Sequence, residues 1–208
     1  MPDLIYVPIV HTEADLGTLA KSFKDEYLKR YSRHRYENHV PTIQRMWDEI
    51  SVSLLKLDLE WHKTRLYQDG LPVCGKEMEI VTQLAAQGSR NHQLLLLLIE
   101  KGAHLEGTED RNLLLEEYQY YQNIFKAKNY VMKNRLLQEY KKKSEILLRQ
   151  RDKFIAKQIA KTLRVDETGI LFMGMLHRVE KFLDKKMKVQ YLIRRLPLYK
   201  DARFSSAE

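Results

Sequence analysis

The sequence predicts an α/β fold, a mostly parallel sheet of about four to five short strands covered by helices. Two short apolar runs, at 4–10 and 169–173, are rich in aliphatic residues and typical of strands buried on both faces. Amphipathic helical patterns separate the candidate strands along the chain. Because parallel strands need a crossover between them, this alternation favours a parallel sheet with right-handed connections.

The first predicted unit is a strand at 4–10 followed at once by a helix. The segment Thr12-Glu13-Ala14-Asp15 is a capping-box pattern, and apolar residues recur on one helical face up to Tyr27. After a polar stretch, Pro41 opens a longer amphipathic helix that we expect to end near His62.

The middle of the chain predicts short strands that alternate with helices. Turn residues such as Asp69-Gly70 and Gly88 mark the ends of these elements. The expected elements are a strand at 64–68, a helix at 77–86, a helix that Asn91 caps and that runs to Ile99, and a strand at 103–106.

The segment 110–164 is predicted to be a long helical arm, because it contains neither glycine nor proline and its apolar residues keep helical spacing. Since uncapped helices much beyond about 25 residues suggest a coiled coil or a hairpin, we expect a break near 129–134. The chain is then one domain, 1–208, with the arm inserted before a last βαβ unit. That unit is a strand at 169–173, a short helix to Leu183 and a strand at 188–193.

The composition indicates a folded protein and excludes several classes. The chain of 208 residues is 44% hydrophobic and 31% charged, which are globular values. A single cysteine, Cys74, excludes an internal disulfide and zinc sites built from several cysteines. No apolar run approaches the roughly 18 residues of a membrane span, and the start lacks the basic region of a signal peptide. We therefore expect a cytoplasmic protein with no membrane partner.

The formal net charge of +8 raises the question of a nucleic-acid partner. Lysines and arginines concentrate between 126 and 161, within the arm. Acidic and apolar residues keep helical spacing there, which is typical of a solvated helix face. The arm is also a candidate surface for a homodimer.

Histidines and carboxylates stand at the carboxyl ends of the predicted strands. Ligands bind at this edge of an open α/β sheet, because its loops carry polar side chains and helix N-termini point their positive dipole ends at it. The candidates are His11 and Glu13 after the first strand, Asp69 after the second, Glu106 and Glu109 after the third, and His177 after the fourth.

Two histidines and several carboxylates at one edge suit two kinds of chemistry. One is a general base with an orienting acid, and the other is a divalent metal ion held by His11, His177 and Glu13. Each histidine precedes a predicted helix, whose dipole should keep the ring neutral at about pH 7. A structural interpretation stays open for each histidine alone: His11 caps its helix, and His177 fills a polar niche. Gly174 either lets backbone approach a ligand or allows tight packing.

A helix that begins at Arg151 leads into the second apolar strand, which ends in Gly174-Met-Leu-His177, a GxxH motif. This part of the chain resembles the closing module of the erythromycin esterase, TraB, Tiki and ChaN-like superfamily. The first strand, ending at His11, is similar to the opening strand of that superfamily, with Pro8 where the motif carries glycine.

The resemblance implies an α/β fold whose site lies on the strand edge. It makes His11 and His177 the paired site histidines, Asp69 or Glu109 the acidic partner, and Arg151 a buried or substrate-facing cation. Members of the superfamily include esterases, metal-dependent proteases and a haem-binding protein, so the fold alone does not fix the function.

Three functional hypotheses follow. The first is a hydrolase-like enzyme in which His11 and His177, with a carboxylate, activate water directly or through a divalent metal ion, on a small-molecule or peptide substrate. The second is a non-catalytic module that senses a ligand or binds a protein through the arm. The third is nucleic-acid binding through the basic residues of the arm.

Overall fold

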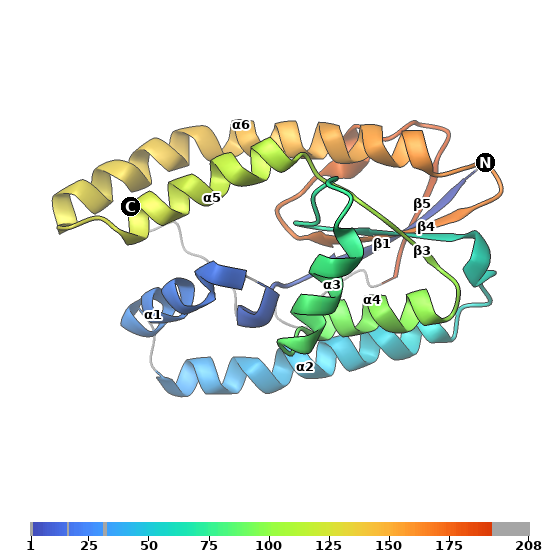
Figure 1. Cartoon of the computed structure of the whole chain (residues 1–208), viewed down its shortest axis with the longest axis horizontal. Coiled ribbons are helices and arrows are strands. Elements are labelled where there is room, and N and C mark those ends of the chain that lie inside the picture. The colour runs from blue at the N-terminus through green and yellow to red at the C-terminus, as the bar shows by residue number, and fades with distance from the viewer. Residues whose placement is uncertain (1, 16, 31–32, 193–208) are drawn as a thin grey trace.

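The computed structural model describes residues 2–15, 17–30 and 33–192, and for residues 30 and 33–40 it describes the backbone alone. Its centre is one parallel sheet with the strand order β3-β2-β4-β1-β5 (Figure 1). The strands are β1 (Asp3–Ile9), β2 (Thr64–Gln68), β3 (His104–Glu106), β4 (Thr168–Gly174) and β5 (Lys188–Tyr191). The predicted α/β fold with a parallel sheet is confirmed.

Side chains on the two faces of the sheet enter two separate apolar cores. On one face, α2 (Arg33–Leu55), α3 (Glu77–Ala86) and α4 (Arg90–Glu100) cover the sheet. On the other face, the C-terminal half of α6 (Tyr130–Thr162) packs on the sheet. Alternation along the strands produces this division: in β1, Ile5 and Val7 enter the first core, and Leu4 and Tyr6 the second. Burial on both faces explains the nearly continuous apolar runs of β1 and β4.

The connections between strands divide in the same way. The chain leaves β1 and β2 over the face covered by α2 and α4, and it leaves β3 and β4 over the face covered by α6. Adjacent strands β2, β4 and β1 therefore send their connections to opposite faces of the sheet. A crevice forms outside the carboxyl ends of strands where this happens, and it is the usual ligand site of such sheets.

The predicted helical arm is a pair of helices, α5 (Arg111–Phe125) and α6, which run side by side past the sheet in Figure 1. The break between them ends at Asn129, whose side chain caps α6 by accepting from the backbone N–H of Met132 (2.9 Å). Helix α1 (Ala20–Arg30) packs against α5 through Phe23, whose ring centroid lies 4.9 Å from that of Tyr121.

Helix α2 differs from its predicted bounds at both ends. It begins at Arg33 and runs through Pro41, which removes one backbone hydrogen bond but holds φ near the helical value. It ends at Leu55, and the apolar stripe that suggested an end near His62 continues outside the helix, with Leu57 and Trp61 still packed on the first core.

The segments that follow β1 and β4 are also less helical than predicted. After β1, two 3-10 turns at Glu13–Asp15 and Gly17–Leu19 precede α1, because the Asp15 carboxylate accepts from the N–H (2.5 Å) and hydroxyl (2.8 Å) of Thr12 and closes a turn. After β4, the predicted short helix is a single 3-10 turn, Val179–Lys181. Helix α4 is capped by Ser89 rather than by Asn91.

Candidate functional site

Three adjacent strands deliver His11, Asp69 and His177 to one edge of the sheet. In the register of the sheet, Ile9 of β1 pairs with Gly174 of β4, and Gln68 of β2 pairs with Phe172. The backbone N–H of Asp69 extends this pairing by donating to the carbonyl of Phe172 (2.9 Å). The residues that follow β1, β2 and β4 therefore meet where the strand connections diverge.

The carboxylate of Asp69 lies at the centre of this group. Its Oδ2 accepts from the backbone N–H of Gly174 (2.9 Å) and lies 3.0 Å from Nε2 of His11. Its Oδ1 accepts from Nη2 of Arg151 (3.0 Å) and lies 3.5 Å from Nε2 of His177. Burial works against the charged form, but His11 and His177 outweigh it and hold the pKa of Asp69 well below its usual value. Asp69 is therefore a buried, ionised carboxylate.

Gly174 allows the Asp69 carboxylate to approach the end of β4. A Cβ atom at this position would lie 2.7 Å from Oδ2 of Asp69 and 3.5 Å from Nε2 of His11. Of the two interpretations of this glycine, the structure favours close approach, with the Asp69 side chain as the group that approaches.

Arg151 of α6 binds three carboxylates from different parts of the fold. Its Nε and Nη2 donate to the two oxygens of Glu109 (2.5 and 2.7 Å), Nη1 donates to Glu117 of α5 (2.6 Å), and Nη2 also donates to Asp69. Glu109 is fully buried, which raises its pKa, while the charge of Arg151 opposes that rise. The backbone N–H of Gly70 donates to the same carboxylate (2.7 Å). Arg151 is a buried cation, one of the two roles that the resemblance allowed.

The two histidines occupy different environments. His177 is buried between two acids, with Nδ1 2.6 Å from Asp152 of α6 and Nε2 facing Asp69. His11 pairs with Asp69 alone, its side chain is 34% exposed, and its Nδ1 has no partner among the described residues. His11 is therefore the histidine whose second ring nitrogen can meet a ligand.

The expectation that helix dipoles disfavour the imidazolium form of both rings is wrong in direction, because the pKa of each ring is raised. Burial disfavours the imidazolium form of His177, but Asp152 and Asp69 outweigh it and raise the pKa of His177 to about 10. Burial also disfavours the imidazolium form of His11, but the charge and hydrogen bond of Asp69 outweigh burial and raise the pKa of His11. The neighbouring carboxylates decide the charge state, and the segment after each histidine is a 3-10 turn without the dipole of a full helix.

A second polar cluster fixes the segment that follows His11. Asp15 accepts from the hydroxyl of Ser89, the N-cap of α4, and Ser89 Oγ lies 2.7 Å from Nδ1 of His92. Ser89, His92 and the Asp15 side chain are all buried. We interpret the cluster as an anchor that ties the end of β1 to the start of α4 and so places His11.

Five of the predicted site residues come together in the structure: His11, Asp69, Glu109, Arg151 and His177. Glu13 is not part of this group, because its carboxylate pairs with Lys24 (3.0 Å). Glu106 binds Arg65 instead. The sequence analysis missed two residues of this ionic group, Asp152 and Glu117. Both lie on helices, and the rotation of these helices relative to the sheet cannot be read from the sequence. The position of Asp152 directly after Arg151 was the only available signal.

Asp69, Glu109 and His177 form a candidate metal-binding group, because they offer ligand atoms that all lie within 4.8 Å of one another. Oxygen and imidazole ligands suit several divalent ions, which bind such atoms at about 2.0–2.2 Å. In this arrangement, however, Nη2 of Arg151 already lies 3.0 Å from Asp69 Oδ1 and 2.7 Å from Glu109 Oε1. The group therefore does not fit a metal ion unless the guanidinium moves away.

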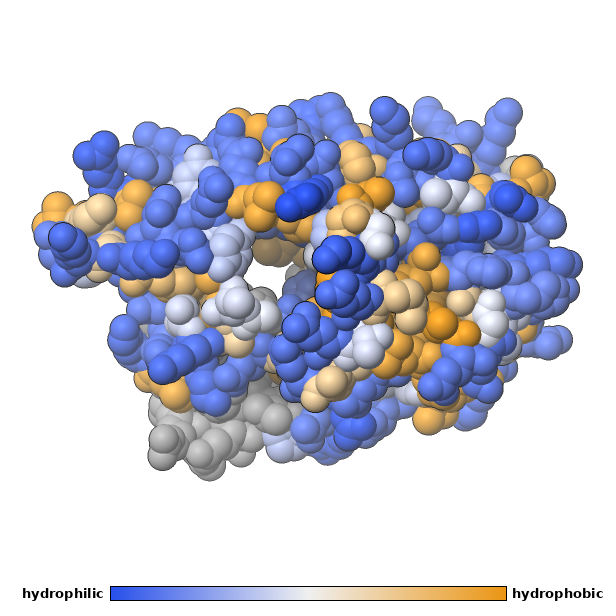
Figure 2. All heavy atoms as spheres, viewed as in Figure 1, coloured by the Kyte–Doolittle hydropathy of each residue, from blue (hydrophilic) through white to orange (hydrophobic). Residues whose placement is uncertain are grey.

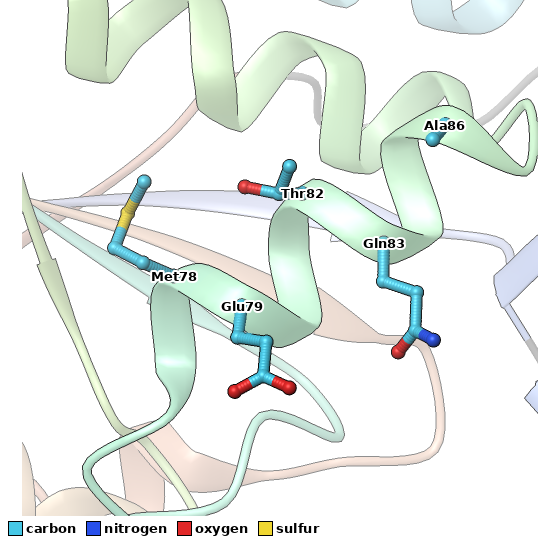
Figure 3. A pocket seen from close by; sticks show the side chains of 5 residues that line it. All are labelled: Met78, Glu79, Thr82, Gln83 and Ala86. Carbon is cyan, nitrogen blue, oxygen red and sulfur yellow. The ribbon is translucent and has the colours of Figure 1, made fainter.

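Figure 2 shows a gap between the α5–α6 pair and the elements below it, near the carboxyl end of β1 in the same view of Figure 1. A separate shallow pocket runs along α3, lined by Met78, Glu79, Thr82, Gln83 and Ala86 (Figure 3). None of its lining residues belongs to the ionic group.

No helix in the described part of the chain is both long and apolar enough to cross a membrane. The comparisons with known proteins add no relative: no family model, curated protein or solved structure matches this chain.

Proposed function

We propose that the carboxyl edge of the sheet is a hydrolytic site in which His11, oriented by Asp69, acts as the general base that activates water. The observation that carries the proposal is the 3.0 Å contact between His11 Nε2 and a buried carboxylate, combined with a partly exposed ring whose Nδ1 has no partner among the described residues. A general base must combine these two features, a fixed orientation and a nitrogen that a water molecule can reach.

The chemistry follows from the roles of the two ring nitrogens. In the neutral form of His11, Nε2–H donates to Asp69, and Nδ1 is the acceptor that can take a proton from a water that attacks an ester or amide carbonyl. Because Asp69 raises the pKa of His11, this neutral form becomes more populated as the pH rises, and activity should rise with it. The carboxylate stabilises the imidazolium that forms, and the imidazolium returns its proton to the leaving alkoxide or amine as the C–O or C–N bond breaks. Asp69 is well suited to this because Gly174 N–H and Arg151 hold it in place. His177, which is buried, positions Asp69.

The resemblance to the erythromycin esterase, TraB, Tiki and ChaN-like superfamily supports this proposal. Gly174 and His177, the two fixed positions of the GxxH motif, both contact Asp69, and Arg151 of the preceding helix binds the same carboxylate. We therefore propose a relationship to that superfamily and a carbonyl substrate, either a small-molecule ester or a peptide. Hydrolysis through a divalent metal ion is the alternative form of the same proposal.

The direct test is hydrolysis of p-nitrophenyl acetate, p-nitrophenyl butyrate and an unstructured peptide mixture by the purified chain. We expect activity in the wild type, and we expect His11→Gln to lower kcat/KM by about 100-fold or more. His62→Gln, a change at a strongly exposed histidine, serves as the matched control and should retain full activity. Equal activity of folded His11→Gln and wild type on the same substrate would refute the assignment of the base.

A second candidate function is self-association through the arm, and one observation favours it. Tyr130, Val131 and Met132 are three consecutive exposed apolar residues at the start of α6. Exposed apolar clusters of this kind mark interaction surfaces. If they join two copies of the chain, light scattering should report a dimer for the wild type and a monomer for Val131→Lys. A wild-type monomer at high concentration would exclude this function.

Nucleic-acid binding is less well supported by the arm. Several of its basic side chains are engaged within the chain: Lys133 with Glu26, Arg135 with Glu139, and Lys143 with Glu116. If nucleic acid binds all the same, its affinity should fall steeply as the salt concentration rises.

A further inference from the structure

We propose that Arg151 is the resident cation of this site, standing between Asp69 and Glu109 where a divalent metal ion would otherwise bind, so that the site works without a metal. The inference deepens the proposed function, since it names the cation of the same site. It rests on the proposed function in one respect, namely that this edge of the sheet is the functional site.

The position of the guanidinium is the first argument. Nη2 alone contacts an oxygen of each carboxylate in the candidate metal-binding group, Asp69 Oδ1 at 3.0 Å and Glu109 Oε1 at 2.7 Å. These are two of the three buried groups whose ligand atoms lie within 4.8 Å of one another. A metal ion bound to both oxygens would have to approach them from the space that Nη2 holds, because ion and guanidinium would share the same acceptors.

The second argument is that the donors of the Arg151 guanidinium match the positions of the surrounding carboxylates. Nε, Nη1 and Nη2 each donate to a carboxylate, and the partners come from the ends of β2 and β3 and from α5. A planar guanidinium presents its donors in a fixed geometry that matches several carboxylates at once, which a single metal ion or a lysine cannot reproduce at these distances. The Arg151 side chain is 9% exposed, so water does not compete for these bonds.

The charges of the group are the third argument. Asp69, Glu109 and Glu117 bring three carboxylates to a largely buried place, and such a place is unstable without a compensating cation. Arg151 supplies that cation from within the chain. A substitution that removes the guanidinium and keeps the carbon chain leaves a group of possible metal ligands without its cation. This group consists of two carboxylates and one imidazole, those of Asp69, Glu109 and His177.

The proposal predicts that removing the guanidinium creates a metal site. Wild type, Arg151→Met and the double variant Arg151→Met/Glu109→Gln are incubated with Zn²⁺ or Mn²⁺, desalted and subjected to elemental analysis, and their melting temperatures are measured with and without the ion. We expect no stoichiometric metal in the wild type, about one equivalent in Arg151→Met together with a rise in melting temperature, and loss of both effects in the double variant.

Two outcomes overturn the proposal. One is a stoichiometric ion in the wild type that Asp69→Asn removes, because the site would then hold a metal beside Arg151. The other is a folded Arg151→Met that binds no ion. If Arg151→Met does not fold even when it is refolded with Zn²⁺, Arg151→Lys replaces it. The three donors of an ammonium leave from one atom and do not match carboxylates that are arranged around a planar guanidinium. Zn²⁺ should therefore raise the melting temperature of Arg151→Lys more than that of the wild type, and equal shifts also overturn the proposal.

A chelator separates this inference from the proposed function. Hydrolysis by the wild type that is unchanged by EDTA supports both. Hydrolysis that EDTA abolishes and Zn²⁺ or Mn²⁺ restores overturns the resident-cation proposal and leaves the hydrolytic function standing. Absence of hydrolysis on every substrate counts against the function, while the metal measurements still decide the role of Arg151.

Discussion

Two arginine-centred clusters lie toward opposite ends of the sheet, and their difference shows what makes one of them a candidate site. Near the amino ends of β2 and β4, Arg65 binds Glu167 through Nε and Nη2 (2.6 and 2.8 Å) and Glu106 through Nη1. At the carboxyl ends, Arg151 binds Asp69, Glu109 and Glu117. Both clusters use one guanidinium to hold several carboxylates, and both join elements that are distant in the sequence.

Only the carboxyl-end cluster adds imidazoles to the carboxylates. Asp69 touches both His11 and His177, whereas the contacts of Arg65 are with acids alone. Pairing of charges therefore explains how each end of the sheet is held together, and it does not by itself indicate function. The capacity for proton transfer comes from the histidines, and above all from His11, whose side chain is partly exposed and whose Nδ1 has no partner among the described residues.

The largest expected effect is on stability. Arg151→Met leaves the buried carboxylate of Glu109 without its main cation and Asp69 with the two histidines alone, and it should lower the free energy of unfolding by about 3–5 kcal/mol in metal-free buffer. Arg65→Met should cost less, about 1–3 kcal/mol, because its cluster is more exposed and its acids can be hydrated. Urea unfolding of the two variants measures the difference. Equal losses would break the distinction between the two clusters.

The second prediction is that the two clusters lose their contributions to stability in different pH ranges. His177 has a folded pKa of about 10, above the value of about 6.5 expected when unfolded, so its protonated form favours the folded state. That contribution is fully present below about pH 6.5 and should be lost as pH rises toward 10.

The Arg65 cluster should respond in the acid range instead. The bond to Arg65 lowers the pKa of Glu167, so its contribution is lost as pH falls through that lowered pKa. Unfolding measured from acid to alkaline pH, with His177→Gln as the control, tests both windows. An unchanged alkaline slope in His177→Gln would show that another group is responsible.

The two glycines of β4 offer a matched pair of changes at the two ends of the sheet. A Cβ at Gly174 would lie 2.7 Å from Asp69 Oδ2, and a Cβ at Gly169 would lie 2.7 Å from Cδ1 of Leu4. Each alanine substitution should cost about 1–3 kcal/mol through overpacking. Only Gly174→Ala should also reduce hydrolysis, because it displaces the carboxylate that orients His11. Loss of activity in Gly169→Ala, at equal folded fraction, would contradict this division.

The smallest effect on stability is expected at the hydrogen bond that links the carboxyl-end cluster to the rest of the helical arm. The Tyr140 hydroxyl donates to Glu117 (2.6 Å), whose other oxygen accepts from Arg151. Tyr140→Phe removes this bond at a partly exposed acid and should cost about 0.5–1.5 kcal/mol in urea unfolding. Hydrolysis should stay within about twofold of wild type, and a large loss of activity would extend the site into the arm.

Much of the fold could be predicted because buried parallel strands leave a clear pattern. The runs at 4–10, 64–68 and 169–173 correspond to β1, β2 and β4, and α3 has the predicted bounds. The start of α2 could not be predicted, because Pro41 is usual at a helix start and here lies inside the helix. The turn after His11 was mistaken for a helix start, because Asp15 and Thr12 make the same local hydrogen bonds in both.

The residues of the candidate site that could be predicted are those that the ends of the strands position. His11, Asp69, Glu109 and His177 each lie within three residues of the end of a strand, so the topology of the sheet brings them together. Arg151 was suggested only by the resemblance. The direction of the histidine pKa shifts was predicted wrongly, because the acids that cause them approach from α6 and across β4 and lie far from either histidine in the sequence.

The central position of Asp69 has a consequence for the order in which the protein becomes functional. Its carboxylate bonds to groups 58, 82 and 105 residues away along the chain, in segments before β2, in α6 and at the end of β4. Contacts of such long range form only after the intervening chain has been ordered. A growing chain that still lacks β4 therefore holds His11 and Asp69 without the bonds that fix them. The geometry needed for proton transfer arises together with the finished sheet, which couples any activity of this protein to complete folding.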